Sequence, residues 1–515
     1  MRRRSWLAQR LGGLLIILMF FLLASPGCAD QLDRVRGGWY PWKPYQFLEH
    51  SRDGRDLSGL DVSLFREIFE QELGKSLELP QLNWDIHQLQ LQRGETDVAG
   101  GAFKTDERSR YAYFSDSYRT EDIVLVARRH HSAARSILNQ PGFLQAIQTN
   151  DLRLGVVKGY SYGDAIDTWL RDPAQNGRRV ETNSVRQNLD HLIQGKVDLV
   201  AVDRLVGAAM IWEQGLSDRV VIGHQPVFSG PIFAMFSRKS STKELVDAFN
   251  QALQTIRDDG RYNQIVRDQL FPTLLGLTAD QPWFILLESI GTAAFAFSGV
   301  LLARREQFSL FGAFVLASLP AAGGGLMRDV IANRPQPAVV LASHHLLIVA
   351  IVVVLSSVIL RYPHQIHLSR FIRILEAKGT AIVHVLDAIG LASFTVAGVI
   401  VAVEEQCEPL LLWGPIFSAM TGAGGAILRD IVRADSSHPT LRHELYAEIS
   451  IFWGLVLSWF ILIYADAQRV NLLPINTFVV ITAMGCLLTR LLVIQKGVQA
   501  PLFVRVERIR NRFLR

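Results

Sequence analysis

Cysteine is scarce in this sequence, and the spaced ligand sets of metal sites are missing. Only three cysteines, Cys28, Cys407 and Cys486, occur among 515 residues, and they fall in a leader, a loop and an apolar run. A disulfide framework is therefore not expected. The adjacent histidines at 130–131 and 344–345 lack metal-ligand spacing. We expect no metal and no cofactor.

The sequence also lacks the motifs of common enzymes and of nucleic-acid-binding proteins. It has no Walker-type phosphate loop, no RNA-binding motif and no nucleophile with a partner base at the end of a predicted strand. The net charge is only +5, and Lys and Arg are scattered over the soluble part or collected beside apolar segments, which argues against nucleic-acid binding. We therefore expect a protein that is not an enzyme.

Apolar residues are distributed unevenly along the chain. They make up 49% of it, and the mean hydropathy is +0.19, values that favour a membrane protein. Residues 30–272 mix charged and apolar side chains like a soluble protein, whereas apolar runs follow one another from Trp283 to Ile494. The sequence therefore predicts a multidomain protein with one soluble part and one embedded part.

Residues 1–29 have the three regions of a secretory leader. Three arginines at 2–4 precede an apolar core at 11–24, and small residues precede Asp30, where cleavage is expected. The alternatives are an uncleaved membrane anchor and a lipid-modified Cys28, the second being weaker because Ser25 stands where a lipoprotein signal has a larger aliphatic residue. In each case the residues that follow are exported.

The exported region, 30–272, alternates short strand-like runs with amphipathic helices, a pattern typical of an α/β domain. Its motifs resemble those of the family 3 periplasmic solute-binding proteins. The motifs that carry this resemblance, in order, lie at 59–62, 91–101, 105–108, 113–118, 154–161, 195–203, 249–250 and 260–262. The resemblance implies two α/β lobes, joined by two crossovers, that close over a polar amino acid or a similar small molecule.

Three polar residues are candidates for holding that ligand. Arg108 closes a Thr-x-x-Arg motif, whose arginine grips the ligand carboxylate in the resembled family, and a guanidinium suits this because it binds carboxylates in a bidentate fork. Ser161 follows Gly159 near a predicted helix start and could add a hydroxyl and backbone N–H groups. Asp203 follows a buried strand and matches the acid that takes the ligand ammonium.

Each candidate has a structural alternative. Arg108 could instead pair with Asp106 or Glu107 on a solvated loop, and Asp203 could cap a helix that begins near Leu205. The aromatic residues Trp42 and Tyr45 could cover the apolar part of the ligand or simply pack within the lobe. Gly101, at the glycine end of a buried strand, completes the set of predicted ligand-binding residues.

After a linker at 273–282, seven apolar segments are long enough to cross a bilayer, which requires about 20 residues. They are 283–303, 308–333, 338–360, 380–403, 410–434, 445–465 and 474–495. A basic tail, 496–515, follows. In the resembled family the binding fold occurs fused to a peptidoglycan-cleaving domain or in front of sensor kinases, and it also serves ATP-driven importers. In this sequence membrane segments follow it.

Positive charge predicts the orientation of these segments. If the first segment starts outside, the inner connections and the tail carry Arg304, Arg305, Arg361, Arg370, Arg373, Lys378, Arg442, Lys496, Arg505, Arg508, Arg510, Arg512 and Arg515. The outer connections carry Glu404, Glu405, Glu408 and Asp466, with Arg334 and Arg469 as exceptions. We expect a multi-pass protein of a bacterial inner membrane, with the binding domain in the periplasm and the tail in the cytoplasm.

The first three segments and the next three form a repeat, 283–360 and 380–465, with 474–495 as a seventh helix. Glu288 precedes Gly291 and Gly299 at the same spacing as Asp387 precedes Gly390 and Gly398. Because each repeat has three crossings, the second copy enters the membrane from the opposite face. This predicts the inverted architecture of many transporters.

The second and fifth segments each carry a glycine cluster followed by Arg-Asp. The matching residues are Gly323, Gly324, Gly325, Arg328 and Asp329 in the first copy and Gly424, Gly425, Ala426, Arg429 and Asp430 in the second. This pair of motifs resembles the trimeric intracellular cation channel family, whose bacterial branch includes proteins described as glycine transporters. The resemblance implies a homotrimer with a hydrophilic path through each subunit.

Glycine breaks in matching places of two halves indicate a transport site at the repeat interface. Carbonyls released there could coordinate a cation or a substrate ammonium, although close helix packing also explains glycines in membranes. Arg328 and Arg429 could bind a carboxylate of the substrate or could instead form local ion pairs with Asp329 and Asp430. Acids within apolar helices, Glu288 and Asp387, are functional by default, and His384 and Arg490 are weaker candidates.

The sequence thus favours a transporter of glycine or another small amino acid, whose exported domain captures the ligand and presents it to the membrane part. One alternative is a monovalent-cation channel that amino-acid binding gates. Another is a soluble domain that acts as a sensor or assembly module without effect on transport.

Overall fold

The computed structural model describes residues 33–51, 54–279, 281–334, 336–341, 344–361, 369–433, 445–465 and 472–500. The chain divides into two compact units, Met1–Gln269 and Leu270–Arg515. Several expectations fall outside the described residues: the leader at 1–29 with Cys28, the charges at Arg442, Asp466 and Arg469, and the tail beyond residue 500.

In its described residues the first unit contains three sheets and the helices that cover them. The strands are β1 (Arg34–Arg36), β2 (Phe47–Ser51), β3 (Gly54–Ser58), β4 (Ser76–Glu78), β5 (Val98–Ala102), β6 (Ala112–Phe114), β7 (Arg119–Arg128), β8 (Leu154–Val157), β9 (Arg179–Thr182), β10 (Leu199–Asp203), β11 (Val220–Ile222) and β12 (Phe228–Ser237). The helices are α3 (Leu60–Arg66), continued by a π-helical stretch Glu67–Glu72, α4 (Trp84–Arg93), α5 (Asp106–Ser109), α6 (Ser132–Ser136), α7 (Phe143–Thr149), α8 (Asp164–Arg171), α9 (Val185–Ile193), α10 (Arg204–Glu213), α11 (Lys243–Asp258) and α12 (Arg261–Ala279).

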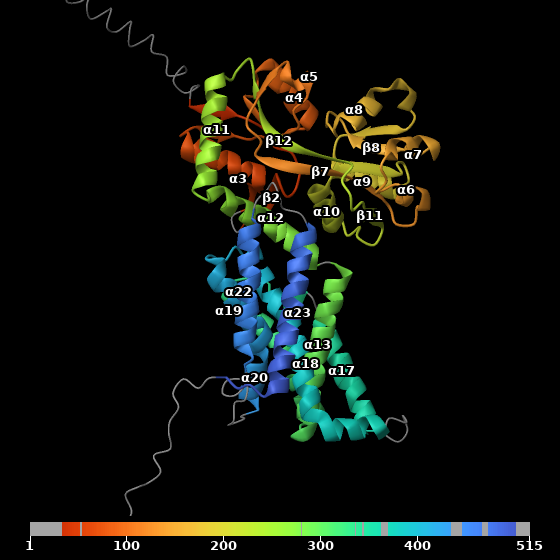
Figure 1. Ribbon diagram of the computed structural model, residues 1–515, viewed down its shortest axis with the longest axis vertical. Coiled ribbons are helices and arrows are strands. Elements are labelled where there is room, and N and C mark those ends of the chain that lie inside the picture. The colour runs from red at the N-terminus through yellow and green to blue at the C-terminus, as the bar shows by residue number, and fades with distance from the viewer. Residues whose placement is uncertain are drawn as a thin grey trace, which may run out of the picture. The chain divides into compact units, whose positions relative to one another are not determined.

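The first unit has two lobes because each of the long strands β7 and β12 belongs to both of them. The largest sheet has the order β5-β12-β7-β10-β8-β9, with β6 beside β12 and β11 beside β7. The first half of β12 pairs with the first half of β7, while its second half pairs with β5 and β6. Strands β7 and β12 therefore run from one lobe into the other (Figure 1). The predicted two-lobed α/β domain with two crossovers is confirmed.

Buried apolar strands form the centre of each lobe. All five residues of β10 are buried, and β5 is buried except at Gly101. Such continuously apolar strands are expected where helices cover both faces of a sheet. Helices α3, α4, α5 and α11 surround the first lobe, and α6 to α10 surround the second (Figure 1).

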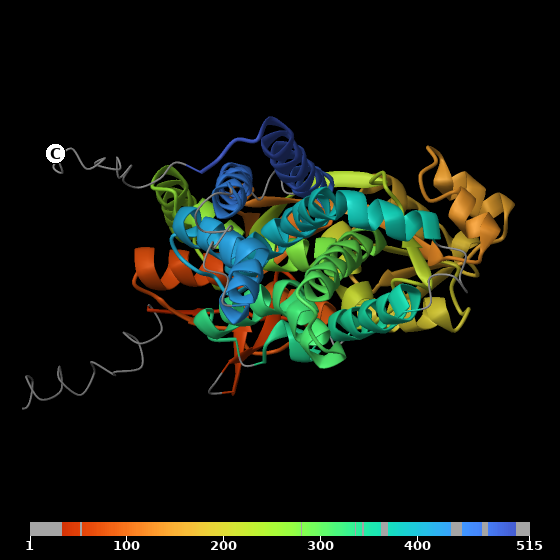
Figure 2. The same cartoon turned by 90° about the horizontal axis from the view of Figure 1, so that it is seen from below.

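The second unit is helical. Its elements are α13 (Pro282–Arg305), α14 (Leu310–Ser318), a π-helical stretch Leu319–Gly323, α15 (Gly324–Ile331), α16 (Ala338–Leu341), α17 (His344–Arg361), α18 (Ser369–Glu404), α19 (Leu410–Ala419), a π-helical stretch Met420–Gly424, α20 (Gly425–Val432), α22 (Ala447–Tyr464) and α23 (Leu472–Lys496). Helices α13 and α18, the first helices of the two repeats, pack side by side at the centre of this bundle (Figures 1 and 2).

Six helical segments of the described chain are long and apolar enough to span a membrane, and α17 is a shorter apolar helix. The third predicted segment, 338–360, is thus divided into α16 and α17. The fourth is longer than predicted, because α18 begins at Ser369 rather than at 380. Arg370, Arg373 and Lys378, which were expected in a connection, belong to this helix, and Arg361 ends α17.

The linker expected at 273–282 is not a separate irregular segment. Helix α12 continues through Pro272 to Ala279, and Pro282 opens α13. Proline is well tolerated in the first turn of a helix because that position needs no N–H donor. The residues expected to form a linker are therefore mostly helical.

Candidate functional site

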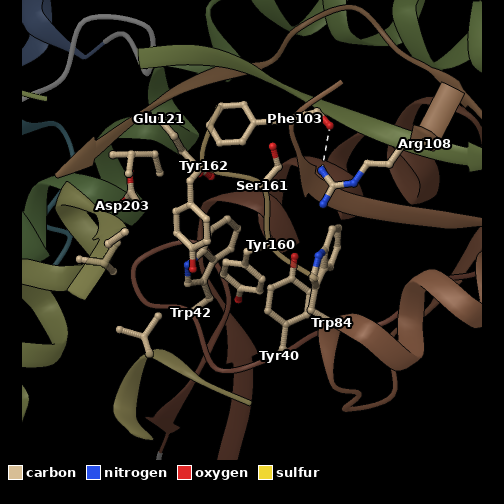
Figure 3. Close-up of a pocket in the computed structure, with 15 residues that line it drawn as sticks. Tyr40, Trp42, Trp84, Phe103, Arg108, Glu121, Tyr160, Ser161, Tyr162 and Asp203 are labelled. Carbon is tan, nitrogen blue, oxygen red and sulfur yellow. Dashed lines mark hydrogen bonds between the residues drawn. The ribbon is translucent and has the colours of Figure 1, made fainter. Parts of the chain in front are cut away.

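A pocket lies between the two lobes of the first unit, and Figure 3 shows its lining. The lining residues come from both lobes and from a crossover strand: Tyr40, Trp42, Trp84, Gly101, Phe103, Arg108, Glu121, Ile123, Tyr160, Ser161, Tyr162, Val185, Ala201, Val202 and Asp203. Five of the six predicted ligand-binding residues are among them. The sixth, Tyr45, lies just behind Trp42, with ring centroids 5.2 Å apart.

Arg108 is buried at one end of the pocket. Helix α5 positions it, and the Thr105 side chain caps this helix by accepting a hydrogen bond from the Arg108 backbone N–H. The guanidinium donates from Nη1 to Phe103 O (2.8 Å), from Nη2 to Gly159 O (3.0 Å) and from Nε to Gln88 Oε1 (3.2 Å). The alternative of a solvated pair with its acidic neighbours is wrong. A guanidinium has five N–H donors, so each Nη keeps one for a ligand.

Asp203 stands at the opposite end of the pocket and also caps a helix. Its Oδ1 accepts hydrogen bonds from the backbone N–H groups of Leu205 and Val206, each 3.0 Å long, at the start of α10. The capping alternative is therefore confirmed, and it leaves the second carboxylate oxygen for other contacts. Burial raises the pKa of Asp203 to about 6.

Glu121 is a second acid at this end, and sequence reasoning missed it. The side chain is only 3% exposed and its Oε1 lies 2.6 Å from Arg119 Nη1. Burial raises the pKa of Glu121 to about 8, against the opposing effect of Arg119 and with a further rise from Asp203. The available signal was the i, i+2 spacing of Arg119 and Glu121, which places both on one face of a strand.

Arg119 lies outside the lining of the pocket and stabilises its acidic end. It pairs with Asp61 through two bonds, Nε to Oδ1 (2.7 Å) and Nη2 to Oδ2 (3.1 Å). The Tyr45 ring lies against the guanidinium, 3.6 Å from its central carbon to the ring centroid, a cation–π contact. The packing alternative therefore describes Tyr45, which supports Arg119, better than direct ligand contact does.

Ser161 is placed differently from the expectation. Its hydroxyl donates to Asp167 Oδ2 (2.5 Å), and the backbone N–H of Tyr162 donates to Asp167 Oδ1 (2.8 Å). The helix that follows, α8, begins only at Asp164. The donors predicted for a ligand anion are thus taken by a carboxylate of the protein, and Ser161 offers the pocket mainly the lone pairs of its oxygen.

Aromatic rings close the pocket between its two charged ends. Trp42 packs against Tyr40 and Tyr160, with centroid separations of 5.6 and 6.1 Å, and Trp84 packs against the same two rings. Gly101 has φ +77°, and a Cβ there would come within 2.5 Å of the Trp42 ring. Gly101 is therefore required for the position of Trp42, and its N–H donates to Tyr118 Oη (2.8 Å).

The lobes are closed in this structure. Three side chains of the first lobe, Trp84, Gln88 and Arg108, donate to the single carbonyl of Gly159 in the second lobe. The space left inside is about 20 Å³, roughly what one water molecule needs. A ligand therefore requires the lobes to separate and the aromatic rings to move before it can enter.

In the membrane unit, the two glycine-Arg-Asp segments cross each other at their breaks. Each break is a π-helical stretch directly before the paired glycines, as is common at functional sites. A Cβ on Gly324 would come within 2.4 Å of Met420 O, and a Cβ on Gly425 within 2.4 Å of Leu319 O. Each expected break is a π-helical stretch inside a helix that otherwise continues, Leu310–Ile331 and Leu410–Val432, and close packing accounts for these two glycines.

The contacts are reciprocal, as a twofold-related pair of repeats requires. A Cβ on Gly299 would meet the carbonyl of Leu316, and one on Gly398 would meet that of Phe417, each within 2.4 Å. Likewise Gly323 faces the Leu428 side chain while Gly424 faces that of Met327. These glycine contacts in one repeat thus have counterparts in the other.

The Arg-Asp pairs are both buried. In the first repeat Arg328 donates from Nε and Nη2 to Asp329 Oδ1, at 2.9 and 2.7 Å, and from Nη1 to Thr421 Oγ1 at 3.3 Å. In the second repeat Arg429 Nη1 lies 3.5 Å from Asp387 Oδ2, and its Nε lies 3.5 Å from Asp430 Oδ1. The local-pair interpretation therefore holds for the first arginine, while the second also contacts the acid of α18.

A cavity of about 80 Å³ adjoins the first pair. Its lining includes Glu288, Arg328, Asp329, His345 and Thr421. His345, which sequence reasoning did not select, lies 3.0 Å from Thr292 Oγ1 through its Nδ1. The weaker candidates lie elsewhere: Arg490 donates to Leu445 O and packs on Tyr446, and His384 does not line this cavity.

Ion pairs also connect the two repeats at the ends of their helices. Arg334, an exception to the charge bias, pairs with Glu404 and Glu405 at the end of α18. Arg433 pairs with Glu306 just after α13. The ion pairs of Arg334 with Glu404 and Glu405 explain why this positive charge lies with the acidic outer connections.

Two family models match the chain in separate regions. The model described as "Bacterial extracellular solute-binding proteins, family 3" matches residues 37–270. The model described as "Glycine transporter" matches twice, at 285–362 and 384–461, which confirms the predicted duplication.

Relatives of the two regions differ in kind. The UPF0126 inner membrane protein YadS of Escherichia coli (strain K12) is 31% identical over 221 residues, covering 43% of this chain and 96% of the relative. The L-cystine-binding protein TcyA of Bacillus subtilis (strain 168) is 26% identical over 222 residues, covering 42% of this chain and 75% of the relative. A solved ancestral arginine-binding protein bound to glutamine is 24% identical and covers 46% of this chain and 97% of its own, with a TM-score of 0.39.

Proposed function

The chain belongs to the UPF0126 family of membrane proteins through its duplicated helical region and carries a family 3 solute-binding domain before it, and from this we propose that it is an inner-membrane transporter of a small amino acid such as glycine. In this proposal the solute-binding domain lies in the periplasm, captures the amino acid and presents it to the membrane domain. The membrane domain then moves the amino acid across the bilayer, and the chain works as a homotrimer.

The observation that carries the proposal is the charge separation within the soluble pocket. Arg108 lies at one end, and Glu121 and Asp203 lie at the other (Figure 3). A zwitterionic amino acid presents a carboxylate and an ammonium to two such ends. Charge-assisted hydrogen bonds of this kind are about twice as strong as neutral ones, so both ends contribute to recognition.

The comparisons support the choice of ligand class. The family model of the membrane region is described as a glycine transporter, and relatives of the soluble region are named as cystine-binding, histidine-binding and amino-acid-binding proteins.

A thermal-shift screen of the purified full chain against the amino acids tests this function. A bound ligand stabilises the folded state by about 2.7 kcal/mol when its concentration is 100 times its Kd. We expect glycine or another small amino acid to raise the unfolding temperature in a concentration-dependent way. If no amino acid does so up to millimolar concentration, the soluble domain is not an amino-acid receptor and the proposal fails.

Ligand affinity should fall as the pH is lowered from 8 to 5. The ligand ammonium binds ionised carboxylates, and the pKa values of Glu121, about 8, and Asp203, about 6, place their protonation in this range. Binding should therefore release protons at pH 7. Isothermal titration calorimetry in buffers of different ionisation enthalpy measures both effects.

The variant Glu121→Gln separates the two acids in that measurement. It should weaken binding and shift the remaining pH dependence to the range of Asp203, near pH 6. An affinity that stays constant from pH 5 to 8 in the unaltered protein would show that neither acid meets the ligand ammonium.

A further inference from the structure

The two repeats place one acid at the same position of their first helices, but among the described residues only the acid of the second repeat, Asp387, has a basic side chain within ion-pair distance. Glu288 lies in α13 three residues before Gly291, as Asp387 lies in α18 three residues before Gly390. In the second repeat Arg429 Nη1 is 3.5 Å from Asp387 Oδ2. In the first repeat the equivalent arginine, Arg328, is turned to Asp329 and Thr421.

The Glu288 carboxylate therefore lines the cavity without an ion pair or hydrogen bond from the described part of the chain. The other charges that line this cavity, Arg328 and Asp329, neutralise each other. The cavity therefore carries a net negative charge when Glu288 is ionised. Leaving a carboxylate unpaired in an apolar bundle is expensive, so a cation from outside the protein would be strongly favoured there.

We propose that Glu288 binds a monovalent cationic group from solution, the ammonium of the transported amino acid, and that Arg429 fills the equivalent place in the second repeat. This inference rests on the proposed function for the identity of the cation. The guanidinium of Arg429 on Asp387 shows which kind of group the equivalent acid accepts.

The surroundings of Glu288 fit an amino acid with little side chain. The cavity of about 80 Å³ holds several water molecules. Arg328 uses three of its five donors, which leaves one N–H on each Nη for a carboxylate. His345 lies at the opening of α17 beside Thr292 and lines the same cavity. An ammonium on Glu288 and a carboxylate near Arg328 would complete a neutral site.

A free monovalent cation shares the chemistry of an ammonium at a carboxylate, so the experiment needs two tracers. Purified full-length protein is reconstituted in proteoliposomes, and initial uptake of labelled glycine and of labelled rubidium is measured in parallel. The variants are Glu288→Gln, which removes the charge, and Glu288→Asp, which keeps it. Glu408→Gln is the control, because it removes one acid from an exposed position outside the cavity.

We expect Glu288→Gln to lower glycine uptake at least tenfold, Glu288→Asp to retain part of it with a raised KM, and Glu408→Gln to match the unaltered protein. The retained activity of Glu288→Asp separates loss of charge from loss of folding. If only rubidium uptake depends on Glu288, the cation site stands and the proposed amino-acid transport is wrong. If neither tracer depends on the charge at 288, the site itself is refuted.

Discussion

Replacing Arg108 by alanine should strongly weaken amino-acid binding by the soluble domain, with Kd raised at least about 25-fold. The guanidinium is buried at the pocket end and keeps two N–H donors for a carboxylate. Removing one partner of a buried, hydrogen-bonded charge pair costs about 2–5 kcal/mol, and each 1.4 kcal/mol is a factor of ten in Kd. Titration calorimetry on the purified full chain measures the change.

Arg93→Ala is the matched control for this substitution. Arg93 belongs to the same lobe, at the end of α4, but its side chain is mostly exposed and pairs only loosely with Glu95 at 3.8 Å. Exposed ion pairs contribute little, so Arg93→Ala should leave Kd unchanged. Equal affinities of the Arg108→Ala variant and the unaltered protein would remove Arg108 from the ligand site.

Gly324→Ala should disrupt the membrane domain, while Gly325→Ala should be tolerated. A Cβ on Gly324 would come within 2.4 Å of Met420 O and 2.6 Å of Thr421 O, so the backbones of the two broken helices must separate. The nearest atom to a Cβ on Gly325 is an Arg328 side-chain nitrogen at 3.6 Å. Overpacking costs typically 1–3 kcal/mol, and more where backbone must move.

The second repeat supports this contrast. Ala426 occupies the position equivalent to Gly325, whereas Gly425 matches Gly324. We expect Gly324→Ala to lower the unfolding temperature of the purified protein by several degrees and to reduce uptake at least tenfold. Gly325→Ala should behave like the unaltered chain. If both variants are equally stable and active, the close crossing at Gly324 is not required.

Motif order made the soluble fold and Arg108 predictable, because short segments such as Thr105–Arg108 specify a cap and a side chain together. Glu121 was not predictable in the same way. Its place in the pocket depends on β7, which runs between the lobes, and on Arg119, which contacts Asp61 and Tyr45 from distant parts of the sequence. For Ser161 the motif was less informative. The sequence predicted that its hydroxyl would bind a ligand anion, but in the structure the hydroxyl donates to Asp167.

In the membrane domain, spacing predicted the duplication and the breaks but not their packing. Glycine clusters indicate a break, yet only the fold shows that Gly324 meets Met420 and Gly425 meets Leu319. The difference between Glu288 and Asp387 was also hidden, because the two motifs are nearly identical in sequence. It arises because Arg328 pairs with Asp329, whereas Arg429 contacts Asp387.

The central claim is that amino acids cross the bilayer through this chain, and parallel recording of labelled amino-acid uptake and potassium current in the same proteoliposomes tests it most directly. The account predicts uptake of the amino acid that stabilises the protein, well above that of protein-free vesicles. Potassium current without amino-acid uptake would contradict the account and favour a cation channel.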